Sequence, residues 1–177
     1  MHPKTEHVYG LMFFDLISHL PKDVPILVSA GEIDCRGPII NVSRSNGASL
    51  PRVVEKCVSR YLAGVKKIME LGWNIIMYSP VPNMFVEEVP AGYAFPEGLS
   101  TEDWCLEKEY AVRVFDDTIK SSGMPVISLV EWIFENNVSY DERFWWDVSH
   151  INERVWPQLL IEFSKLGINL SLEKKYD

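Results

Sequence analysis

The 177-residue sequence lacks an excess of basic residues: 17 Lys and Arg stand against 25 Asp and Glu, and the formal net charge is -8. Because nucleic-acid binding needs a basic surface, no nucleic-acid partner is expected. The sequence also lacks an apolar run long enough to cross a bilayer. The residues after Met1 do not resemble a signal peptide, because no apolar stretch follows a basic start. We therefore expect no membrane partner and a cytoplasmic protein.

The sequence contains only three cysteines, Cys35, Cys57 and Cys105, and they lack the CxxC or Cys/His spacing of metal sites. The odd number suits reduced thiols in a cytosol-like compartment. Neither a metal nor a cofactor is expected. Hydrophobic residues make up 47% of the chain and aromatic residues 12%, which excludes a disordered chain and predicts one globular domain over residues 1–177.

Amphipathic helices alternate along the chain with short apolar strands, which predicts an α/β fold with a parallel sheet covered on both faces. The helix predicted from Ser100 to about Ser121 is expected to bury Leu106, Tyr110, Val114 and Phe115. Two segments, Glu32 to Leu50 and Asn83 to Leu99, are predicted to be long loops. Periodicity and breaker residues predict strands at Val24–Ala30, Trp73–Tyr78 and Pro125–Leu129, and helices from Val8 to Leu20, Pro51 to about Leu71, Ser100 to about Ser121, Val130 to Glu135 and Pro157 to about Leu166.

The first candidate site is Asp147-Val148-Ser149-His150, between the third strand and the last helix. An Asp that orients an imidazole, and an imidazole that takes a proton from a nucleophile, form the base half of a catalytic triad. The pattern is short, and it is also typical of a turn in which Asp147 caps the main chain and His150 satisfies local backbone. Both interpretations stay open at this point.

The second candidate site follows the first strand and contains Gly31, Glu32, Asp34 and Arg36. Ligands of parallel sheets bind outside the carboxyl ends of the strands, so these side chains are expected beside the ligand. Gly31 permits a sharp turn that can bring a main-chain N–H close to a ligand. Alternatively, Arg36 pairs with a carboxylate and only holds the loop. The same rule predicts one shared sheet edge for Gly31–Arg36, Ser79–Asn83 and the His150 loop.

These two motifs resemble blocks of the SGNH (GDSL-like) hydrolases. Gly31-Glu32-Ile33-Asp34 is similar to the third block, G-x-N-D, and Asp147 to His150 is similar to the fifth, D-x-x-H. Gly-Glu-Ile-Asp-Cys-Arg further resembles a carbohydrate-associated subset, and the likeness covers about Val8 to Leu166. It implies a three-layer, flavodoxin-like α/β/α sandwich that hydrolyses small-molecule or glycan esters. His150 would be the general base, Asp147 would fix its tautomer, and residues 31–34 would line the oxyanion side.

The chain departs from that family in two respects. Ile33 stands where the family has an Asn donor, and no Gly-Asp-Ser block precedes the strand at Val24–Ala30. We therefore expect the C-terminal part of an SGNH-type esterase, deacetylase or acyltransferase, with its serine nucleophile supplied upstream. Without a neighbouring strand, Val24–Ala30 becomes an exposed edge that could pair with another chain, for example in a homodimer.

Other interpretations are a catalytically inactive, carbohydrate-binding module of the same fold, and an unrelated α/β domain in which both motifs are accidental. Cys35 could substitute as the nucleophile, and Asp34, Asp147 and His150 could hold a metal, but neither is favoured. In the binding module, sugars would stack on the aromatic side chains of Tyr93, Phe95, Trp104, Trp145 and Trp146. Ordinary packing of these side chains in the core or in loops is the favoured interpretation.

Overall fold

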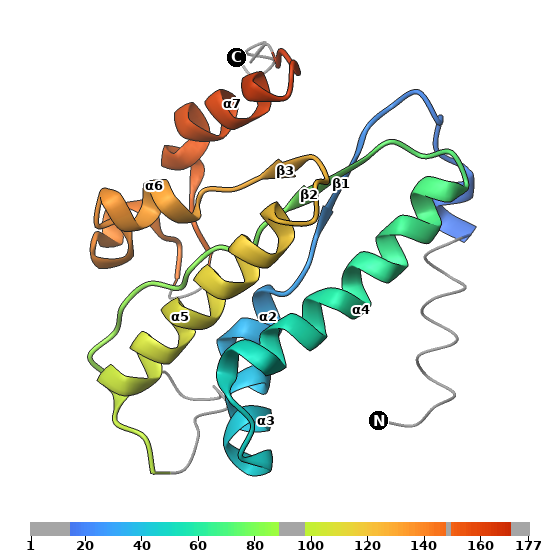
Figure 1. The fold of residues 1–177 in the computed structure, drawn as a ribbon. Helices are drawn as coiled ribbons and strands as arrows, with labels where there is room; N and C mark the ends of the chain where they lie inside the picture. Colours follow the sequence, from blue (N-terminus) through green and yellow to red (C-terminus); the bar gives the residue numbers. More distant parts are fainter. Residues whose placement is uncertain (1–14, 89–97, 148–149, 171–177) are drawn as a thin grey trace.

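A computed structural model describes residues 15–88, 98–147 and 150–170 of the chain (Figure 1). The predicted helix over residues 8–20 lies partly outside this range, and its described part is helical at residues 15–18. Most of the predicted loop over residues 83–99 also lies outside the described residues. The elements are β1 (Ile26–Ser29), α2 (Glu32–Arg36), α3 (Pro38–Asn46), α4 (Leu50–Glu70), β2 (Ile75–Tyr78), α5 (Thr101–Lys120), β3 (Val126–Ile127), α6 (Val130–Glu135), the 3-10 turns η1 (Val138–Tyr140), η2 (Glu142–Phe144) and η3 (Glu153–Val155), and α7 (Trp156–Lys165).

The three strands form a parallel sheet in the order β1-β2-β3. Ile26 of β1 lies opposite Ile75 of β2, and Met77 of β2 lies opposite Val126 of β3. The prediction of a mixed α/β fold with a parallel sheet is confirmed. Because the strands are parallel, the segments that leave β1, β2 and β3 start from the same edge of the sheet.

Helices α4 and α5 lie side by side and cover one face of the sheet (Figure 1). Pro51 occupies the first turn of α4, where its missing N–H is not needed, and the Ser100 side chain accepts the N–H of Asp103 to cap α5. No helix among the described residues is long and apolar enough to cross a membrane. The core between the helices and the sheet includes Val54, Val58, Val65, Ile68, Ile75, Met77, Val112, Phe115 and Ile119.

The buried face of α5 differs from the prediction. Leu106 and Tyr110 are 49% and 50% exposed, whereas Phe115 is fully buried as predicted. The helix packs against α2, α3 and α4 together, so it buries a broad face whose position tertiary contacts determine. That face includes two charged residues, which a hydropathy pattern assigns to the surface; it comprises Trp104, Cys105, Lys108, Ala111, Val112, Phe115, Asp116 and Ile119.

The prediction of a long loop over residues 32–50 was wrong, because α2 and α3 occupy this segment. In α2 an ion pair joins Glu32 and Arg36, four residues apart, on the same side of the helix. Pro38 starts α3, and Gly47 ends it in the left-handed conformation. The apolar positions that the two helices bury are few, namely Cys35 in α2 and Ile39 and Ile40 in α3, so they form no long periodic pattern in the sequence.

Strand β1 is an edge strand and is not fully buried, contrary to the prediction. Ile26 and Val28 pack against the core, whereas Leu27 is 46% exposed on the opposite face. Within the described residues β1 has one strand neighbour, β2. The predicted exposed edge is therefore present.

Candidate functional site

The carboxylate of Asp147 contacts His150 twice. The Nδ1 atom of His150 lies 2.7 Å from Oδ2 of Asp147, and the main-chain N–H of His150 donates to Oδ1 at 2.9 Å. Asp147 thus caps the turn, as one interpretation of this motif predicts, and the same carboxylate also contacts the imidazole. An ionised carboxylate at Nδ1 favours the tautomer in which Nδ1 carries the proton and Nε2 is a free base.

The Nε2 side of His150 is open. The His150 side chain is 57% exposed, and no described residue forms a hydrogen bond with Nε2. A proton-donating group can therefore approach the basic nitrogen from solvent or from another segment.

A short hairpin holds the two residues in place. Trp145 and Ile151 form an antiparallel bridge, and the N–H of Trp146 donates to the carbonyl of His150 at 2.8 Å. Trp145 anchors the hairpin because it is 7% exposed and its Nε1–H donates to the carbonyl of Val138 at 2.9 Å. Trp145 is therefore a core residue, which agrees with the favoured interpretation and excludes it as a sugar platform.

The segment after β1 turns sharply at Gly31, whose φ is +88°. A Cβ at this position would lie 2.2 Å from Cζ of Phe115, so close packing on that ring also requires glycine. Arg36 forms an ion pair with Glu32, which confirms the alternative in which the pair holds the segment. Neither these two side chains nor Asp34 forms a hydrogen bond or ion pair with Asp147 or His150 within the described part of the chain.

The segments after β1 and β2 start from the carboxyl ends of two paired parallel strands, as predicted. The hairpin that carries His150 lies beside the segment that follows β2. Residues 31–36 leave β1 and residues 79–83 leave parallel β2. Burial, with a further contribution from Glu32, raises the pKa of Tyr78, the last residue of β2, to about 12. Met84 and Asp147 line one cavity of 410 Å³. The pair of Asp147 and His150, which we call the dyad, therefore lies next to the segment that follows β2.

The thiol of Cys35 does not suit the role of a nucleophile. The side chain is 2% exposed, and burial, followed by the charge of Asp34, raises the pKa of its thiol. All three cysteines are free thiols. Among the described residues no group of three His, Cys, Asp or Glu side chains could hold a metal ion.

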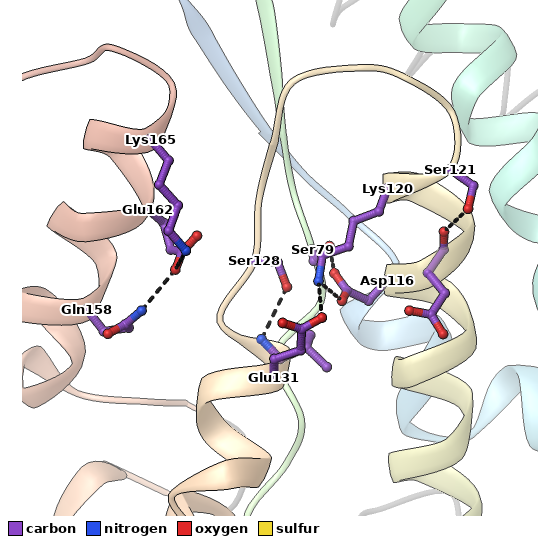
Figure 2. Close-up of polar contacts among 11 residues, drawn as sticks. Ser79, Asp116, Lys120, Ser121, Ser128, Glu131, Gln158, Glu162 and Lys165 are labelled. Atoms are coloured by element: carbon purple, nitrogen blue, oxygen red, sulfur yellow. Dashed lines mark hydrogen bonds and ion pairs between the residues drawn. The ribbon is translucent and has the colours of Figure 1, made fainter.

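A polar network at the carboxyl end of β2 was not predicted from the sequence. The Ser79 hydroxyl donates to Oδ1 of Asp116 at 2.6 Å, and Nζ of Lys120 lies 2.8 Å from Oδ2 of the same carboxylate. Figure 2 shows Lys120 between Asp116 and Glu131 of α6, whose Oε1 is 3.1 Å from the ammonium group. The network joins the end of β2 to α5 and α6. The spacing of Asp116 and Lys120, four residues apart on a predicted helix, was its only signal in the sequence.

A second buried charge, Lys108, was also missed. It is 4% exposed, and its Nζ lies 3.5 Å from the centroid of the Trp104 ring, a cation–π contact. Burial lowers the pKa of Lys108. Trp104 is itself 1% exposed, so it belongs to the core, as the favoured interpretation has it, and cannot stack on a sugar. Tyr93 and Phe95, from the same prediction, lie outside the described residues.

No protein-family model, curated protein or solved structure matches this chain. The likeness to SGNH hydrolases therefore depends on the two sequence motifs alone.

Proposed function

We propose that this chain is the C-terminal part of an SGNH-type ester hydrolase that acts on carbohydrate esters. The contact that carries the proposal is the 2.7 Å approach of His150 Nδ1 to Asp147 Oδ2, with Nε2 open to a reacting group. The α/β fold, with the motif of Gly31 at the carboxyl end of a parallel strand, agrees with it.

In this proposal Nε2 of His150 takes the proton of a serine hydroxyl as the serine oxygen attacks the ester carbonyl. The imidazolium, stabilised by Asp147, then returns the proton to the sugar oxygen as its bond to the acyl carbon breaks. Water hydrolyses the acyl-enzyme by the same route, and a second sugar hydroxyl in place of water would make the reaction an acyl transfer. Main-chain N–H groups of residues 31–34 would face the oxyanion, because Ile33 offers no side-chain donor.

The serine is proposed to come from upstream sequence, on a strand that pairs with the edge of β1 that has no partner among the described residues. Leu27, 46% exposed on this edge strand, would be covered by such an addition. The added strand would also extend the sheet toward the three-layer sandwich that the resemblance implies.

The test is acetyl release from acetylated xylan and 4-nitrophenyl acetate by the protein from its native source and by its full-length variants. His150→Ala should lower kcat by at least about a thousandfold, and Asp147→Asn by roughly the same order. His19→Ala is the matched control, because His19 and Asp15 form a surface pair with 3.9 Å between Nε2 and Oδ1. Unchanged turnover in His150→Ala would refute the proposal.

A catalytically inactive carbohydrate-binding module is the second candidate, and one observation favours it. Trp146 is 73% exposed beside the dyad, where its ring is available to a sugar. Glycan binding by the chain without any release of acetyl groups would select this alternative.

A further inference from the structure

Two open cavities meet beside the dyad. A cavity of 410 Å³ extends from Trp146 and Asp147, and one of 450 Å³ extends from Phe85 and Tyr140. Both are lined by Met84, Glu142 and Arg143, so they adjoin along η2. We call the two adjoining cavities, which extend from Trp146 and Asp147 to Tyr140, the η2 groove.

An exposed aromatic ring lies at each end of the η2 groove. Tyr140 is 60% exposed, and Phe85 backs its ring with 5.0 Å between centroids and an interplanar angle of 23°. One face of Tyr140 is therefore supported and the other is available. At the opposite end the hairpin fixes the main chain of Trp146, whose N–H donates to the carbonyl of His150. Aromatic side chains have only two χ angles, so they lose little conformational freedom when a ligand stacks on them.

Between the two rings the groove carries fixed polar groups. Arg143 is held by Asp141 through Nε–Oδ1 and Nη2–Oδ2 contacts of 2.8 and 2.6 Å. The pair offers donors and acceptors at set positions, which suits hydroxyl groups. With Glu142 and Asp147 also present, carboxylates outnumber the one guanidinium along the groove, so an anionic ligand is disfavoured.

We propose that the η2 groove binds a neutral oligosaccharide across at least two sugar rings. One ring stacks on Trp146 beside His150, and another stacks on Tyr140. The sugar ester that His150 would process is therefore part of a chain of sugars rather than a monosaccharide. This inference rests on the carbohydrate assignment of the proposed function, but it concerns binding, which is measured separately from turnover.

The test is titration calorimetry with cellohexaose, xylohexaose and chitohexaose, each compared with its monosaccharide. At least one hexasaccharide should bind at least about tenfold more tightly than its monosaccharide, a difference of ~1.4 kcal/mol. Tyr140→Ala should reduce the affinity for that hexasaccharide by about tenfold and leave the monosaccharide affinity unchanged. Trp146→Ala should weaken both, and Trp146→Phe should restore part of the loss because it keeps an aromatic face. Tyr110→Ala is the control, since Tyr110 is 50% exposed on α5 and lines neither cavity.

Equal affinity for hexasaccharides and monosaccharides, no binding of any of these sugars, or hexasaccharide affinity unaffected by Tyr140→Ala would each overturn the inference. His150→Ala distinguishes it from the proposed function, because this variant should bind the hexasaccharide as the wild type does. Oligosaccharide binding together with hydrolysis that survives His150→Ala would refute the base and retain the groove.

Discussion

Replacing Gly31 by alanine should destabilise the fold by about 2–5 kcal/mol, and the structure separates two causes. The φ of +88° places the residue in the left-handed region, where a Cβ costs roughly 1–2 kcal/mol. The same Cβ would lie 2.2, 2.5 and 2.8 Å from three ring atoms of Phe115. That ring is fully buried and meets Tyr61 edge-on at 6.4 Å between centroids, so it has little room to move, and overpacking adds about 1–3 kcal/mol.

Two other glycines isolate these contributions. Gly47 has a φ of +61° with nothing within 4 Å of its Cβ position, so Gly47→Ala should show only the backbone cost of about 1–2 kcal/mol. Gly64 lies inside α4 with open space around it, and Gly64→Ala should stabilise the protein by about 0.5–1 kcal/mol. Urea unfolding of the three variants gives the free energies of unfolding. If Gly31→Ala costs no more than Gly47→Ala, the contact with Phe115 does not constrain this turn.

Three further predictions concern buried groups. Burial, together with Asp34, raises the pKa of the Cys35 thiol, so iodoacetamide at pH 8 should label Cys35 only after unfolding; mass-spectrometric detection of labelling in the folded protein would contradict this. Burial lowers the pKa of Lys108 in the folded protein below its ordinary value of 10.5. At pH values between the lowered pKa and 10.5 the unfolded chain binds more protons than the folded one, so the free energy of unfolding should rise with pH in that range. Lys108→Met should abolish this rise, and an unchanged slope would disprove it. Asp116→Ala should lower the free energy of unfolding by about 1–3 kcal/mol because the buried Ser79 hydroxyl loses its acceptor, whereas Asp117→Ala, on the exposed side of α5, should cost little; equal losses would argue against the network.

Local patterns predicted the long elements well. Helix α4 was predicted from Pro51 to about Leu71 and spans Leu50–Glu70, because its apolar period persists over five turns. The short helices α2 and α3 were missed, although two signals were present. Glu32 and Arg36 have helical spacing, and Pro38 follows Gly37 as the first residue of a new helix.

The candidate site was predictable only where its partners are close in sequence. Asp147 and His150 are three residues apart, so their hydrogen bond follows from local turn geometry. The η2 groove depends on Phe85 packing against Tyr140, a contact between distant segments that no local pattern encodes. Likewise, the sequence does not show which of two adjacent tryptophans the hairpin buries.

Asp147 is proposed to fix His150 as a base with its free nitrogen at Nε2. Long-range proton–nitrogen NMR correlation of the neutral His150 ring measures the tautomer directly. We expect a proton on Nδ1 and none on Nε2 in the wild type, and a shift of this balance in Asp147→Asn. A wild-type ring protonated mainly at Nε2, or a tautomer balance unaffected by Asp147→Asn, would contradict it.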